Sequence, residues 1–80
     1  MKIYPNPNEG IFNIRIADNK ISNNNILTVY NLKGQQLIQK KNIRDNEQID
    51  LREFGTGHYI INLVSGKNII SEKVYCTGSK

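Results

Sequence analysis

The sequence lacks several features that would point to a particular chemistry. It has one cysteine, Cys76, so no disulfide can form within the chain, and it has no tryptophan. One cysteine and one histidine, His58, cannot make a structural zinc site. No apolar run approaches the ~20 residues of a membrane-spanning helix, and no basic-then-apolar signal peptide begins the chain. We therefore expect an excised domain that uses no metal and no cofactor.

Charge is also too dispersed to define a partner. The chain has a formal net charge of +4 and a pI of about 9.4, but its basic residues are scattered, apart from Lys40-Lys41. Such a distribution is more typical of a solvated surface than of a nucleic-acid footprint, although basic charge with four tyrosines leaves a weak nucleic-acid signal. With 80 residues, we expect one domain (1–80), with a core over 3–75 and a tail over 76–80.

The dominant positive signal is alternation of apolar and polar residues. Phe12, Ile14 and Ile16 would share one face of a strand within 10–17. Strands over 26–30 and 57–64 follow the same rule, and weaker ones are expected over 2–4, 36–40, 48–51 and 68–75. About seven short strands predict an all-β fold, a small immunoglobulin-like antiparallel β-sandwich.

Turn residues separate these strands. Tight hairpins are expected at Asn31–Gly34 and Ser65–Asn68, and a two-glycine corner at Phe54–Gly57. Polar loops are expected over 18–25 and 41–46. Pro5 should end the first strand because proline cannot donate to a ladder, and Asn6-Pro7 would then direct the chain across the end of the sandwich.

Candidate catalytic groups are few. His58 alternates out of phase with Tyr59, so it should face solvent, and no nucleophile or orienting carboxylate is predicted beside it. Four acidic residues cluster in sequence and could in principle bind calcium or cleave glycosides: Asp45, Glu47, Asp50 and Glu53. Asp50 should point outward from its strand, however, and Arg44 and Arg52 are close enough to neutralise part of the cluster, so a solvated charged edge is favoured. Cys76, which we place just after the last strand, has no predicted partner that would lower its pKa. The residues thus favour a protein that is not an enzyme.

The order of short motifs along the chain is more informative than any one of them. Ile3-Tyr4-Pro5-Asn6-Pro7 is followed by Gly10, then by Val29-Tyr30-Asn31-Leu32-Lys33-Gly34. Ile49-Asp50-Leu51, Gly57-His58-Tyr59 and Lys73-Val74-Tyr75 complete the series. In this order and spacing the chain resembles the C-terminal sorting domains of the type IX (Por) secretion system, type A, from Ile3 to Tyr75.

The resemblance assigns motif positions residue by residue. They are Tyr4, Pro5, Asn6, Pro7, Gly10, Tyr30, Gly34, Asp50, Leu51, Gly57, Tyr59, Lys73 and Val74. Three places depart from the family pattern: Phe54 replaces a usual leucine, Gly55-Thr56-Gly57 replaces Pro-Ser-Gly, and His58 replaces an apolar residue. The Thr77–Lys80 tail also extends past the family's usual end.

The resemblance implies a function without catalysis. Family members follow a cargo domain that reaches the periplasm by an ordinary signal peptide in Bacteroidetes. The outer-membrane machinery recognises the sorting domain, a sortase-like protease commonly removes it, and the cargo reaches the cell surface or the medium. The expected partners are thus the secretion machinery, the sortase and the cargo, with no nucleic acid and no small-molecule substrate.

Two alternatives from other classes remain open on the sequence. One is a small basic nucleic-acid-binding β fold, which predicts strongly salt-dependent binding to DNA or RNA. An immunoglobulin-like adhesion or carbohydrate-binding module of a surface protein would show the same strand pattern. Position in the parent protein separates such a module from a sorting domain, because a sorting domain must be C-terminal whereas a binding module can lie anywhere.

Overall fold

The computed structural model describes residues 1–5, 9–16, 24–43 and 46–77. Within these parts the chain forms seven strands and one short 3₁₀ helix, and the all-β prediction is confirmed. The elements are β1 (Lys2–Tyr4), β2 (Ile11–Arg15), β3 (Ile26–Asn31), β4 (Gln36–Lys41), β5 (Glu47–Asp50), η1 (Arg52–Phe54), β6 (Gly57–Ser65) and β7 (Asn68–Cys76).

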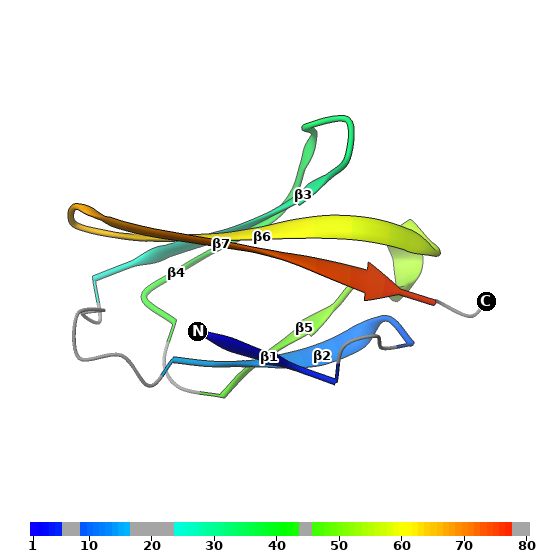
Figure 1. The fold of residues 1–80 in the computed structure, drawn as a ribbon, viewed down its shortest axis with the longest axis horizontal. Helices are drawn as coiled ribbons and strands as arrows, with labels where there is room; N and C mark the ends of the chain where they lie inside the picture. The colour runs from blue at the N-terminus through cyan, green and yellow to red at the C-terminus, as the bar shows by residue number, and fades with distance from the viewer. Residues whose placement is uncertain (6–8, 17–23, 44–45, 78–80) are drawn as a thin grey trace.

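The strands make two antiparallel sheets that face each other, as predicted for a β-sandwich (Figure 1). One sheet has the order β1-β2-β5 and the other β4-β3-β6-β7. β6 and β7 are the longest strands and pair along their whole length, from Gly57 opposite Cys76 to Ser65 opposite Asn68. Since β7 ends the order of its sheet, its other side is an edge of the sandwich.

The residues that the alternation predicted to face inward do form the core. Phe12 and Ile14 on β2 are fully buried, as are Leu27 and Val29 on β3. Ile16 lies just past the end of β2 and is half-buried against the same cluster. The remaining core residues come from both sheets and their connections: Ile43, Ile49, Leu51, Tyr59, Ile61, Leu63, Val74 and Cys76.

The end of the last strand differs from the prediction. Cys76 does not follow β7 but is its final residue, and its side chain is fully buried. The inward alternation of β7 continues from Val74 to Cys76, and cysteine packs there as a small apolar side chain. The core therefore extends one residue beyond the expected boundary at Tyr75.

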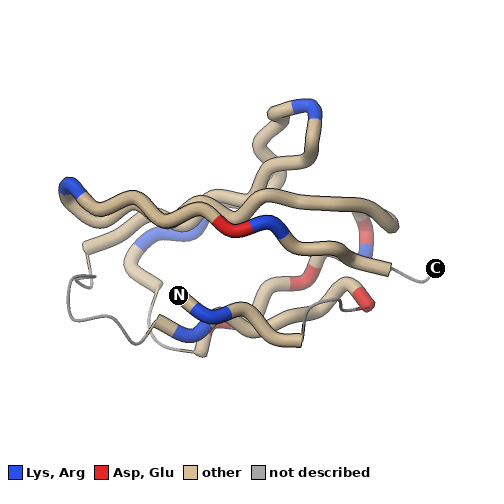
Figure 2. The backbone as a smooth tube through the Cα atoms, viewed as in Figure 1, with Lys and Arg blue, Asp and Glu red and all other residues tan. Residues whose placement is uncertain are grey.

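An ion pair links the two sheets along one open side. Lys40 on β4 lies 2.9 Å from the Glu47 carboxylate on β5, and both side chains keep part of their surface in solvent. Figure 2 shows that charges of both signs are spread over both sheets, with no large region of one sign. The predicted scatter of basic residues is thus visible in the fold.

Candidate functional site

The first motif block fixes the end of β1. β1 ends at Tyr4, and Pro5 follows it, as the sequence predicts. The Tyr4 hydroxyl donates a hydrogen bond to Asn46 Oδ1 at 3.0 Å, which links β1 to the start of the β5 segment. Asn6 and Pro7, also assigned by the motif, lie outside the described residues.

Gly10 and the Asp50-Leu51 pair meet although they are far apart in sequence. The backbone N–H of Leu51 donates to the carbonyl of Gly10 at 2.7 Å, and the Leu51 side chain is fully buried. Gly10 has a φ of 110°, and a Cβ there would lie 2.7 Å from Arg52 Cγ. This close approach explains why glycine suits the position.

Asp50 fixes the turn that follows β5. Its Oδ1 accepts hydrogen bonds from the backbone N–H and the Nε of Arg52, both at 3.0 Å, and its Oδ2 accepts one from Arg52 Nη2 at 2.8 Å. These hydrogen bonds, from the guanidinium first and the backbone second, lower the pKa of Asp50 to about 2. The predicted neutralisation of Asp50 by Arg52 is confirmed, whereas Asp45 and Arg44 lie outside the described residues.

Tyr59 fastens the glycine corner before β6. Gly55 and Gly57 have φ values of 90° and 156°, which any residue with a Cβ rarely adopts. The Tyr59 hydroxyl donates to the carbonyl of Gly55 at 2.6 Å, and its ring is buried in the core. Burial raises the pKa of this hydroxyl, which therefore stays protonated and able to donate.

Asn31 organises the β3–β4 hairpin. Its Oδ1 accepts hydrogen bonds from the backbone N–H groups of Lys33 and Gln35 at 2.9 and 3.0 Å. Its Nδ2 donates to Gln35 Oε1 at 2.7 Å. Gly34 has the positive φ, 86°, that the hairpin prediction required. Tyr30, the other motif residue here, is half-buried opposite Ile60 on β6.

The last motif pair divides between the two faces of β7. Val74 is buried opposite Tyr59, whereas Lys73 is exposed opposite Ile60. His58 is also exposed, as the alternation predicted. Tyr75 is exposed beside it, and the two ring centroids lie 4.8 Å apart. Most described motif residues therefore hold turns or the core, and few are available to a partner.

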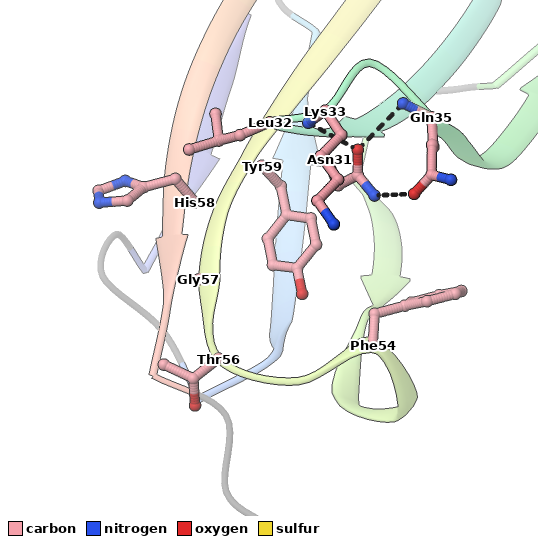
Figure 3. A pocket seen from close by; sticks show the side chains of 9 residues that line it. All are labelled: Asn31, Leu32, Lys33, Gln35, Phe54, Thr56, Gly57, His58 and Tyr59. Atoms are coloured by element: carbon pink, nitrogen blue, oxygen red, sulfur yellow. Dashed lines mark hydrogen bonds between the residues drawn. The ribbon is translucent and has the colours of Figure 1, made fainter.

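The hairpin and the corner border an open hollow of about 480 Å³ at one end of the sandwich (Figure 3). Its walls are Leu32 on the hairpin and Phe54 at the end of η1, both exposed. The other lining residues are Asn31, Lys33, Gln35, Thr56, Gly57, His58 and Tyr59. Two motif segments that are separate in sequence thus form one surface feature.

The sequence did not predict this hollow. Leu32 and Phe54 were noted only as a turn residue and as a departure from the family pattern, and their proximity depends on the pairing of β3 with β6. Exposed apolar residues in two turn segments were the available signal, but such residues are common singly on protein surfaces. Only the tertiary structure brings them together.

Over the ranges that the structure covers, no group of three or more His, Cys, Asp or Glu side chains could hold a metal ion. The same residues include no helix long and apolar enough to cross a membrane. The buried thiol of Cys76 lies in the core.

The fold and the motifs that hold its turns define a small antiparallel β-sandwich domain of two sheets. Residues 2–77 match the family described as "Secretion system C-terminal sorting domain". The chain belongs to this family, the C-terminal sorting domains of the type IX secretion system, whose members are generally non-catalytic. No curated protein matches the chain in sequence.

Membership in this family assigns a general function to the domain. The domain is a C-terminal sorting signal for type IX secretion, which implies attachment to a cargo protein, contact with the secretion machinery and export to the cell surface or the extracellular space.

Proposed function

We propose that the outer-membrane machinery recognises this domain in its folded state while the cargo is still attached in the periplasm. After translocation a sortase-like protease cleaves the chain on the N-terminal side of the domain, and the cargo stays on the surface or is released. The observation that carries the proposal is the family match over 2–77, together with two sheets whose seven strands all pair within the described residues.

β7 is the strand through which we propose that recognition occurs. It spans nine residues at the edge of its sheet, whereas the other edge strands are short or protected. β1 has three residues and ends at Pro5, and β5 has four. β4 carries Lys40-Lys41 and a register shift in its pairing with β3. Short length, proline and bulges all discourage the addition of a strand, and β7, although it carries Lys73, is long and pairs with β6 in an unbroken register. β7 is therefore the edge best suited to accept a strand.

The hairpin geometry predicts which backbone groups of β7 face outward. The two-residue turn at Gly66-Lys67 closes on the pair Ser65 and Asn68, which is the hydrogen-bonded pair in hairpins of this type. From Asn68 onward every second residue of β7 bonds to β6, and the residues between them, including Ser71 and Lys73, direct their N–H groups toward the edge. An added strand would use those groups.

Proline at an edge-facing position tests this proposal. In a fusion of a reporter protein to the domain, Ser71→Pro should lower export at least about tenfold while the domain stays folded, because proline removes an outward N–H without touching the β6 ladder. Ser71→Ala is the matched control, since it also loses the hydroxyl contact to Asn62 but keeps the N–H. Lys73→Pro with Lys73→Gln repeats the comparison. Wild-type export by a folded proline variant would contradict recognition through β7.

Removal by a sortase-like protease has its own readout. The mass of the exported reporter should lack the 80 residues of the domain, and retention of the full fusion mass on the surface would contradict cleavage.

A further inference from the structure

Two of the exposed large apolar side chains of this chain face one hollow. Leu32 leaves 59% of its surface in solvent and Phe54 leaves 36%, and they stand on separate segments that meet only in the folded state. In Figure 3 the hairpin and the corner border the space from two sides, with the Tyr59 ring between them. An exposed apolar pair beside a concavity is typical of a binding surface.

The Asn31, Tyr59 and Thr56 side chains around the hollow are engaged in hydrogen bonds within the domain. The Asn31 side chain bonds to the Lys33 and Gln35 backbone and to the Gln35 side chain. The Tyr59 hydroxyl donates to Gly55, and the Thr56 hydroxyl donates to the carbonyl of Thr77. A sugar needs many hydrogen-bonding partners and would find few here, so the chemistry favours an apolar occupant.

Lys33 supplies the charge at the rim of the hollow. It stands in the hairpin turn and is exposed. Among the described residues that line the hollow, none is acidic. Asp50 lies outside the lining and is held by Arg52, and Glu53 is exposed next to Phe54 but is not part of the lining. A carboxylate on the occupant would therefore find Lys33.

We propose that this hollow receives an apolar side chain of an extended segment of a secretion-machinery protein, with a carboxylate next to it in the segment. The apolar side chain packs between Leu32 and Phe54, and the carboxylate pairs with Lys33. This inference rests on the proposed function, because it assumes that the machinery contacts the folded domain. It adds a second contact, distinct from the edge of β7.

Short peptides test the chemistry directly by nuclear magnetic resonance. The ¹⁵N-labelled domain is titrated with acetyl-Gly-Leu-Asp-Gly-amide, acetyl-Gly-Leu-Lys-Gly-amide and maltotriose. The aspartate peptide should shift the backbone amides of Leu32, Lys33 and Gly57 and bind about two- to fivefold more tightly than the lysine peptide, as one exposed ion pair implies. Equal shifts with both peptides, larger shifts with maltotriose, or no shifts at these residues would overturn the proposal.

Export assays test the contact in its biological setting, with a matched control for each variant. Leu32→Ser and Lys33→Glu should lower export of the reporter fusion by at least about twofold. Ile26→Ser and Lys41→Glu change an exposed apolar residue and an exposed lysine that pair at the far end of β3 and β4, and they should leave export unchanged. Melting curves confirm that all four variants are folded.

The outcomes separate this inference from the proposed function. If the wild-type domain is exported and the hollow variants are exported equally well, the hollow is not a contact and the proposed function stands. If export of the wild-type fusion does not depend on the type IX system, the proposed function is contradicted, and the inference that rests on it is contradicted with it.

Discussion

Gly10, Asp50 and Tyr59 each hold a different turn in place by a different interaction. Gly10 lets the backbone approach Arg52, Asp50 accepts three hydrogen bonds from Arg52, and the Tyr59 hydroxyl fastens the corner at Gly55. A motif residue can thus be required for the fold without contacting a partner. Loss of export on mutation of such a residue says little about recognition unless folding is measured too.

Asp50 predicts a specific pH dependence of stability. Its pKa is lowered to about 2 in the folded domain, against about 3.9 in an unfolded chain. A depressed acidic pKa contributes stability that is fully present above about pH 4 and is lost as the pH falls toward about 2. Asp50→Asn should therefore melt at a lower temperature than wild type at neutral pH, and the difference should shrink as the pH falls through that window.

The matched control for Asp50→Asn is Glu53→Gln, an exposed carboxylate in the neighbouring η1 turn. It should change the melting temperature little at either pH. A melting difference between Asp50→Asn and wild type that stays constant from neutral pH to about pH 2 would contradict the role given to the Asp50–Arg52 pair.

At the level of elements, β7 is both part of the core and the proposed recognition edge. A chain that ends at Lys73 lacks Val74 and Cys76, which are buried against the rest of the sandwich. Burial of such side chains contributes about 1.5–3 kcal/mol each, and a domain of this size is stable by only a few kcal/mol. Circular dichroism should therefore show that this truncation is unfolded.

A chain that ends at Thr77 should instead melt like the full domain, because it retains β7 and the Thr56 contact. An unchanged melting curve for the chain that ends at Lys73 would show that the end of β7 is dispensable for folding. Because we expect truncation of β7 to unfold the domain, export tests of this strand need substitutions at its outer edge that leave the hydrogen bonds between β6 and β7 intact.

Alternation made the strands predictable from the sequence. Leu27 and Val29, or Tyr59 and Ile61, are two residues apart, so their shared inward face needs no knowledge of the rest of the fold. Local turn chemistry was predictable for the same reason, and Gly34 has the expected positive φ. The exposure of His58 also followed from its register alone.

Features that depend on tertiary contacts were not predictable in this way. The 3₁₀ helix Arg52–Phe54 is too short to leave a periodic signal. The ion pair between Lys40 and Glu47 needs the two sheets to be stacked first. The hollow needs the hairpin and the corner to come to the same end of the molecule, and no local pattern encodes that meeting.

At the scale of the whole molecule, the domain is a small two-sheet sandwich with principal extents of 36 × 23 × 16 Å. Its hydrogen-bonded turns and continuous core are built from contacts within the domain itself. A label of this kind can follow many different cargoes because its recognition surfaces belong to the label itself. The long edge of β7 and the hollow are the surfaces that we propose for this recognition.

The most direct test of the central claim is transfer of secretion to an unrelated protein. A fluorescent reporter with a periplasmic signal peptide is fused in front of the 80 residues and expressed in a host with an intact type IX system and in a matched host that lacks it. Fluorescence should reach the cell surface or the medium only in the intact host, and the reporter without the domain should stay in the periplasm in both. Retention in the periplasm of the intact host, or equal release from both hosts, would contradict the account.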